Sequence, residues 1–171
     1  MKTLTLHINK DTKGDYYNYH PKTKDELNEL IEKLIEERGK NADLNDIDVS
    51  AITDMSYIFF HSNFNGDISK WDVSNVTNME YMFGNSKFNK DISNWNVGGV
   101  ENMRSMFQNS KFNKDISNWN VSNVTDMGWM FTHSKFDGDI SDWDVSNVTN
   151  MKYMFNNSPL KNNPPKWYIK K

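Results

Sequence analysis

Two kinds of large side chain recur along this chain at an invariant spacing of 24 residues. A fixed period of this length indicates a stack of similar units, because one short unit cannot bury its apolar side chains alone. The recurring residues are Trp71, Trp95, Trp119, Trp143 and Trp167, together with Met55, Met79, Met103, Met127 and Met151. Four full units, 67–90, 91–114, 115–138 and 139–162, lie between a degenerate leading unit, 43–66, and a partial one, 163–171.

Two apolar patterns follow one another within each unit. In residues 67–90, Trp71 and Val73 are two positions apart, as in a short strand. The apolar residues that come next have the spacing i, i+3, i+6, i+7, which predicts about two turns of helix. These residues are Val76, Met79, Met82 and Phe83. Each unit is therefore predicted to be one coil of strand, turn, helix and turn. The predicted fold class is an α/β repeat, a parallel solenoid of such coils.

The residues before the repeats predict an amphipathic helix. Thr23 and Glu26 have the spacing of a capping box, and the apolar stripe that follows them stops at Gly39. We expect this helix to cover the open N-terminal end of the stacked core. A separate partner-binding element is the alternative role.

A hairpin is predicted upstream of that helix. Apolar residues alternate over positions 4–8, a polar turn follows, and residues 16–19 are rich in tyrosine. The hairpin and the helix together make an N-terminal cap, residues 1–42, and the repeats occupy residues 43–171. Both parts are expected to form one folding domain.

Composition and charge exclude several classes of function. The formal net charge of −3 leaves no basic stripe for nucleic acid, so nucleic acid is excluded as a partner. The chain has no cysteine, which excludes disulfides and thiol chemistry. Its first residues contain no long apolar run and no small-residue cleavage site, so we expect neither a secretory signal nor membrane insertion. From the chain alone we expect a cytoplasmic monomer.

The repeats resemble a known family. The segment Ile68-x-x-Trp71-x-Val73 is similar to the L-x-x-L-x-L core of BspA-type leucine-rich repeat surface proteins. The segment W-D-V-S-N-V-T-x-M-x-x-M-F is similar to the signature of their short-repeat subgroup, DUF285, and the likeness covers residues 43–171. The resemblance implies a leucine-rich-repeat-like solenoid on the bacterial cell surface that adheres to proteins or other cells, and it implies no enzymatic activity.

Two surfaces of the predicted coils are candidate partner-binding sites. The first is the polar, mostly acidic outer face of the predicted strands. It consists of Asp48, Lys70, Asp72, Asn94, Asn96, Asn118, Asn120, Asp142 and Asp144. The alternative to this sheet face is a row of aromatic residues on the predicted helices, between the two methionine columns, namely Tyr57, Tyr81, Trp129 and Tyr153. Such residues are enriched in protein interfaces, whereas lateral packing between helices is the alternative role.

No residues suited to catalysis, cofactor binding or metal binding stand out. His61 and His133 occupy the same repeat position three units apart, too far to share a metal, and we expect them on surface turns. An aspartate precedes each predicted strand, and we expect its carboxylate to accept turn N–H groups, with calcium binding as a minor alternative. These aspartates are Asp67, Asp91, Asp115 and Asp139.

The sequence thus predicts a non-enzymatic recognition module. It is expected to bind a protein or a glycan through one of its repeat surfaces, without a cofactor. The alternative is a structural or self-associating unit.

Overall fold

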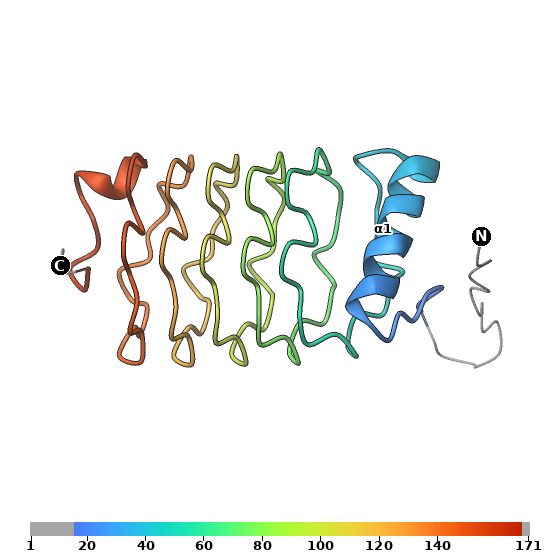
Figure 1. Ribbon diagram of the computed structural model, residues 1–171, viewed down its shortest axis with the longest axis horizontal. Helices are drawn as coiled ribbons and strands as arrows, with labels where there is room; N and C mark the ends of the chain where they lie inside the picture. The colour runs from blue at the N-terminus through green and yellow to red at the C-terminus, as the bar shows by residue number, and fades with distance from the viewer. Residues whose placement is uncertain (1–15, 169–171) are drawn as a thin grey trace.

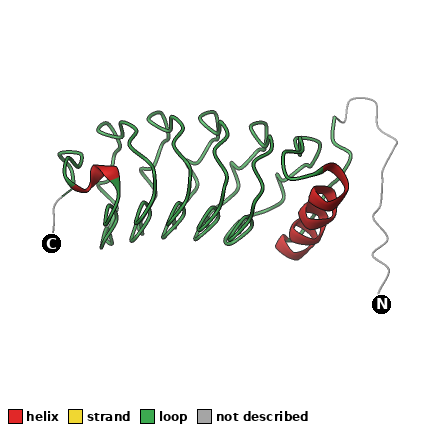
Figure 2. Ribbon diagram, turned by 90° about the horizontal axis from the view of Figure 1, so that it is seen from above, coloured by secondary structure: helices red, strands yellow, loops and turns green. Residues whose placement is uncertain are grey.

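The computed structural model describes residues 16–168. Successive repeats lie side by side as coils along the long axis of the molecule, with one helix at the N-terminal end (Figure 1). That helix is α1, Lys24–Arg38, and a short 3-10 helix, η1, Pro159–Lys161, lies at the other end. Seen from above, the coils follow one another in a single line that α1 continues (Figure 2).

The predicted N-terminal helix is confirmed as α1. The side chain of Thr23 accepts the N–H of Glu26 at 3.2 Å, and the carboxylate of Glu26 accepts the N–H of Lys22 at 2.7 Å. At the other end Gly39 has a φ of 87°, and its N–H donates to the carbonyl of Ile35. The apolar stripe is buried against the first coil. Its buried residues are Leu27, Leu30, Ile31 and Leu34.

The predicted secondary structure of the coils is wrong. Within the described part of the chain, the repeats contain no helix except η1 and no strand, only isolated parallel bridges between neighbouring coils. The assignment as an α/β, leucine-rich-repeat-like parallel solenoid of strand-turn-helix coils is therefore contradicted. What repeats is a coil built from turns, and the hydrogen bonds of its backbone explain why.

Consecutive turns stand where the sequence predicted a helix. In residues 55–62, the N–H groups of Ile58, Phe60 and Ser62 donate to the carbonyl three residues earlier at 3.1–3.4 Å, and that of Ser56 donates to Oδ1 of Asp54 at 2.8 Å. The remaining N–H groups, from Met55 to His61, donate to carbonyls of the next coil at 2.9–3.0 Å. An α-helix would direct all of these groups to the carbonyl four residues earlier. We call the equivalent segments the turn ladder: residues 55–62, 79–86, 103–110, 127–134 and 151–158.

Left-handed backbone at two positions of every turn ladder excludes a right-handed helix. These residues have φ values between 51° and 65°. Asparagine tolerates this conformation better than most residues, and it occupies many of the sites in the second column. The first column is Tyr57, Tyr81, Ser105, Trp129 and Tyr153, and the second is His61, Asn85, Asn109, His133 and Asn157.

The interior consists of columns of like side chains, one from each coil. Neighbouring rings of the main phenylalanine column are 5.6–6.0 Å apart between centroids. Each indole of the tryptophan column donates its Nε1–H to the carbonyl 27 residues earlier, at 2.9–3.2 Å. The prediction that the Met and Phe columns form the core is confirmed. The phenylalanine column is Phe59, Phe83, Phe107, Phe131 and Phe155.

The residues before α1 extend one edge of the first coil. Asn18 donates its N–H to the carbonyl of Asp46, and Asp48 donates its N–H to the carbonyl of Tyr19, both at 2.8 Å. The other half of the predicted hairpin, residues 4–8, lies outside the described residues. The division into a cap, 1–42, and repeats, 43–171, stays a prediction.

A glycine interrupts one column of side-chain hydrogen bonds between coils. In three coils an asparagine donates Nδ2–H to the carbonyl 25 residues earlier, at 2.6–2.9 Å. These residues are Asn75, Asn123 and Asn147, and Gly99 stands at the same position in a fourth coil. One carbonyl of the preceding coil, that of Ser74, therefore faces a glycine.

We expect Gly99→Asn to raise the free energy of unfolding by about 1 kcal/mol, measured by urea denaturation. The new amide can donate to the carbonyl of Ser74, and the unfolded chain loses freedom. Gly99→Ala is the control without the amide. A Cβ at this position lies 3.1 Å from that carbonyl oxygen. Lower stability in both variants would show that the coil cannot make room for a side chain.

Candidate partner-binding surface

The first candidate surface, the polar strip, is exposed except at the half-buried Asp48, but it is not the face of a sheet. Five of its nine residues accept the N–H two positions further on, at 3.0–3.2 Å, and so stabilise turns. They are Asp48, Asp72, Asn96, Asn120 and Asp144. The other four, Lys70, Asn94, Asn118 and Asp142, are exposed. At one end of this strip, Asp48 also contacts Nδ1 of His20 at 3.2 Å.

The aspartate column that precedes the tryptophans also serves turns, as predicted. Each carboxylate accepts the N–H of the serine two positions on, at 2.9 Å, from Asp67 to Asp139. Hydrogen bonds from the backbone and hydroxyl of that serine lower the pKa of each of these carboxyls. Across residues 16–168, no group of three or more His, Asp or Glu side chains is arranged to hold a metal ion. The carboxylates thus have partners within the chain.

The second candidate surface is the aromatic row: Tyr57, Tyr81, Trp129 and Tyr153. Its members were predicted to lie on helices, but they occupy left-handed positions of the turn ladder. Tyr57 is 45% exposed and Tyr153 is 50% exposed, whereas Ser105, at the same position of the middle coil, is buried. The row therefore has two halves, separated by the coil that carries Ser105.

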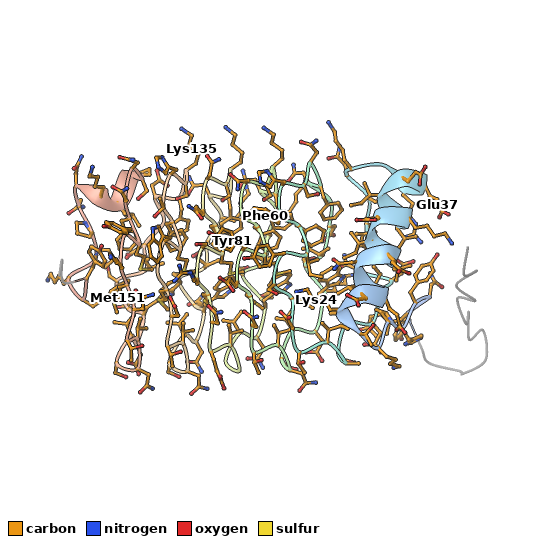
Figure 3. All side chains as sticks on the ribbon, in the orientation of Figure 1. Lys24, Glu37, Phe60, Tyr81, Lys135 and Met151 are labelled. Atoms are coloured by element: carbon orange, nitrogen blue, oxygen red, sulfur yellow. The ribbon has the colours of Figure 1, made fainter. Side chains whose placement is uncertain are left out.

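The N-terminal half of the row is a stacked pair with a third ring against it. The centroids of Tyr57 and Tyr81 are 5.0 Å apart, and their planes differ by 18°. Phe60 packs edge-on against both rings, at 5.3 and 5.4 Å, and lies beside Tyr81 in Figure 3. Burial, and then the nearby carboxylate of Glu80, raise the pKa of the Tyr57 hydroxyl. At neutral pH this hydroxyl is a hydrogen-bond donor as well as an acceptor.

The C-terminal half of the row is held by cations. The guanidinium of Arg104 lies 4.3 Å from the centroid of Trp129, and its Nε is 3.6 Å from a carboxylate oxygen of Glu80. The centroid of Tyr153 is 5.5 Å from that of Trp129, and Nζ of Lys152 lies 5.1 Å from the Tyr153 ring. Tyr153 and Lys152 are exposed, whereas Trp129 and Arg104 are half-buried.

Sequence reasoning missed Phe60, Arg104 and Lys152. A signal for the two cations was present, because the residue just before the aromatic position is charged in three of the five coils: Glu80, Arg104 and Lys152. Phe60 has no counterpart in the other repeats, where this position holds Gly84, Gln108, Thr132 and Asn156. Only the turn geometry shows that its ring reaches the row.

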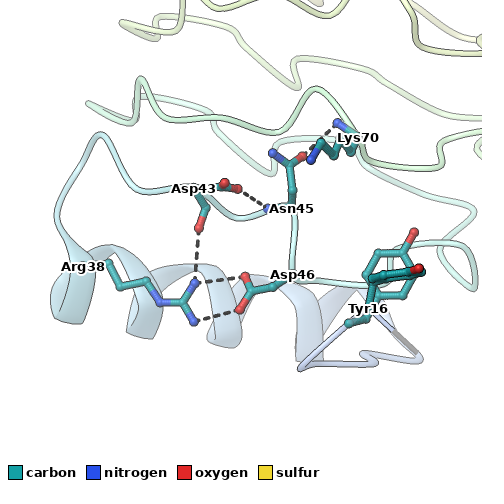
Figure 4. A pocket seen from close by; sticks show the side chains of 7 residues that line it. Tyr16, Arg38, Asp43, Asn45, Asp46 and Lys70 are labelled. Carbon is teal, nitrogen blue, oxygen red and sulfur yellow. Dashed lines mark hydrogen bonds and ion pairs between the residues drawn. The ribbon is translucent and has the colours of Figure 1, made fainter. Parts of the chain in front are cut away.

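A cavity of about 590 Å³ lies between α1, the first coil and the residues before the helix (Figure 4). Arg38 donates from both terminal nitrogens to the carboxylate of Asp46, at 2.9 and 3.0 Å. Although burial opposes it, these bonds and one from Asn18 hold the pKa of Asp46 below its usual range. Lys70 is the one residue of the polar strip that lines this cavity. The ion pair fixes the end of α1 to the coil.

Comparison with known proteins yields one match. A family model described as "Mycoplasma protein of unknown function, DUF285" matches residues 27–134 and again residues 100–171. No curated protein and no solved structure matches the chain. Among the described residues, none of the helices has the length and apolar character needed to span a membrane.

Proposed function

Because the chain belongs to the DUF285 family, whose description assigns no function, its role has to be inferred from its own surface, and we propose a non-enzymatic recognition module. The aromatic row is its binding surface, and its ligand is a protein or a glycan. The resemblance of the repeats to BspA-type surface proteins adds adhesion at a bacterial cell surface to the proposal.

The observation that carries this proposal is the presence of large aromatic side chains on left-handed backbone. A bulky residue with positive φ is a rare and strained arrangement, and it costs about 1–2 kcal/mol relative to glycine. The turn ladder uses only the main chain of these residues, so glycine or asparagine would serve the fold at lower cost. Tyr57 and Tyr153 are about half exposed, so burial offsets the strain only in part. A binding role accounts for their presence.

The arrangement of the rings favours a protein over a glycan. Sugars pack against open ring faces, but Tyr57 and Tyr81 cover one face of each other, and Arg104 covers a face of Trp129. Tyrosine, tryptophan and arginine are the residues that dominate the energetics of protein interfaces. The polar strip is the second surface to test, and five of its nine residues already accept turn N–H groups.

We expect Trp129→Asn and Tyr153→Asn each to weaken binding of the captured partner by about 1–3 kcal/mol. The partner is first captured with the intact chain as bait, and binding is then measured by titration calorimetry. The free energy of unfolding should stay within about 1 kcal/mol of the parent, because asparagine tolerates left-handed backbone.

The matched variants on the polar strip are Asp72→Asn and Asp144→Asn, which remove charge but keep the oxygen that accepts the turn N–H. They should alter only the association rate and its dependence on salt. The reverse outcome would move the site to the polar strip. Capture of nothing but a second copy of this chain would instead support a structural, self-associating role.

A further inference from the structure

The turn ladder of residues 151–158 presents a row of N–H groups that donate to nothing within residues 16–168. In four coils these groups bind carbonyls of the next coil. In the fifth, residues 151–158, the internal turns are present, with Met154 donating to the carbonyl of Met151 and Asn156 to that of Tyr153. The outward groups, which have no described acceptor, are those of Met151, Tyr153, Phe155 and Asn157. Unpaired donors of this kind can bind an added polypeptide segment.

A cavity of about 710 Å³ lies beside this donor row. Its apolar lining includes Met151, Phe155 and Trp167, and Lys152 and Lys161 supply positive charge without any acidic residue. Met151 is labelled in Figure 3, near the end of the stack opposite α1. The site thus offers backbone donors, an apolar recess and two cations together.

The preceding coils show which segment fits such a row. In four coils the donor row binds a segment of the next coil that presents carbonyls at alternate residues, such as those of Asn78, Glu80 and Met82. Where charged residues meet in the column before the aromatic row, they pair: Glu80 of one coil lies 3.6 Å from Arg104 of the next. Lys152 is the last residue of this column, and no described carboxylate lies against it.

We propose that the C-terminal end of the stack binds an acidic peptide segment of a partner protein, which adds its backbone carbonyls to the donor row. The segment places a carboxylate against Lys152 and an apolar side chain in the cavity beside Phe155 and Trp167. A second copy of this chain does not fit. Its own C-terminal end would set Lys152 and Lys161 against the same two lysines, and α1 stands at its other end (Figure 1).

A peptide that copies residues 77–86, acetylated and amidated at its ends, is the probe. In the chain this segment fills the row of the first coil, and it carries Glu80. In a titration followed by ¹⁵N–¹H NMR, we expect the amide signals of Tyr153 and Phe155 to shift and gain protection from exchange. The affinity should be about millimolar, because a free peptide is ordered only on binding.

Charge exchange tests the placement of the carboxylate. A peptide with Glu80→Lys should bind the parent chain about threefold to tenfold more weakly. Its affinity should recover when it binds the full-length Lys152→Glu variant. Lys135→Glu makes the same charge change on an exposed lysine at another edge of the stack and should alter nothing.

Two results would overturn the proposal. One is the absence of any shift at Tyr153 and Phe155 with millimolar peptide, and the other is equal binding of both peptides to the parent and to Lys152→Glu. Concentration-dependent association of the free chain that masks these same amides would show that a second copy is the occupant instead. The Trp129→Asn variant leaves the donor row intact. Loss of peptide binding at the donor row is therefore distinguishable from loss of partner binding at the aromatic row.

Discussion

A chain that begins at Asn41 is expected to lose its cooperative unfolding transition. Four aliphatic side chains of α1 are at most 3% exposed, and each contributes about 1.5–3 kcal/mol by burial. Their sum, about 6–12 kcal/mol, is as large as the whole stability of a typical domain, about 5–15 kcal/mol. Without α1 the apolar residues of the first coil, including Leu44 and Ile47, also lose their cover. The four side chains are those of Leu27, Leu30, Ile31 and Leu34.

Circular dichroism during thermal and urea unfolding measures this effect, and sedimentation shows whether the shortened chain aggregates. The control is the full chain with Glu29→Ala and Glu32→Ala, which change only exposed residues of α1. It should unfold as the parent does, in a single transition. A shortened chain that stays soluble, monomeric and equally stable would show that α1 is no cap.

Phe107→Ala is expected to lower the free energy of unfolding by about 3–5 kcal/mol. The ring is fully buried at the middle of the stack, with Phe83 and Phe131 each at 5.7 Å and Phe112 at 4.3 Å between centroids. Its removal leaves a cavity that columns fixed by main-chain bonds on both sides cannot close. Urea denaturation at equilibrium gives the value.

Two comparisons show whether the column acts as a packed unit. Phe107→Leu retains most of the volume and should cost clearly less. Tyr57→Ala removes a ring of similar size from the exposed first position of the aromatic row, and its cost should be smaller still. A loss below about 1 kcal/mol for Phe107→Ala would mean that the neighbouring coils collapse into the space.

The sequence predicts the period, the core and α1, but not the conformation of the coil. The period is set by which residues are apolar, and those residues are buried in either conformation. Spacing such as that from Val76 to Phe83 matches a helix face, and consecutive turns with one left-handed residue between apolar positions give the same spacing. Only the acceptors of the backbone N–H groups distinguish a helix from consecutive turns. Asp, Asn and Ser at three points of each coil favoured turns, since their side chains compete with helix formation.

The candidate surfaces were predictable in part. Their residues are exposed because they alternate with the core columns, which the repeat makes visible. The left-handed backbone of the aromatic row was not visible, since tyrosine and tryptophan are poor indicators of positive φ. The position of Arg104 over Trp129 depends on the distance between two coils, which no spacing along the chain reveals.

The turn ladder has a consequence for how such a chain can change. Its main-chain bonds between coils do not involve the side chain at the first left-handed position, although rings at this position also pack from one coil to the next. Tyrosine, serine and tryptophan already exchange there without any change in the bonding of Tyr81, Ser105 and Trp129. Five positions, one in each coil, can therefore be altered without changing these main-chain bonds. A chain with the same interior and a different set of five would keep its shape and, if the proposed binding role holds, select a different ligand.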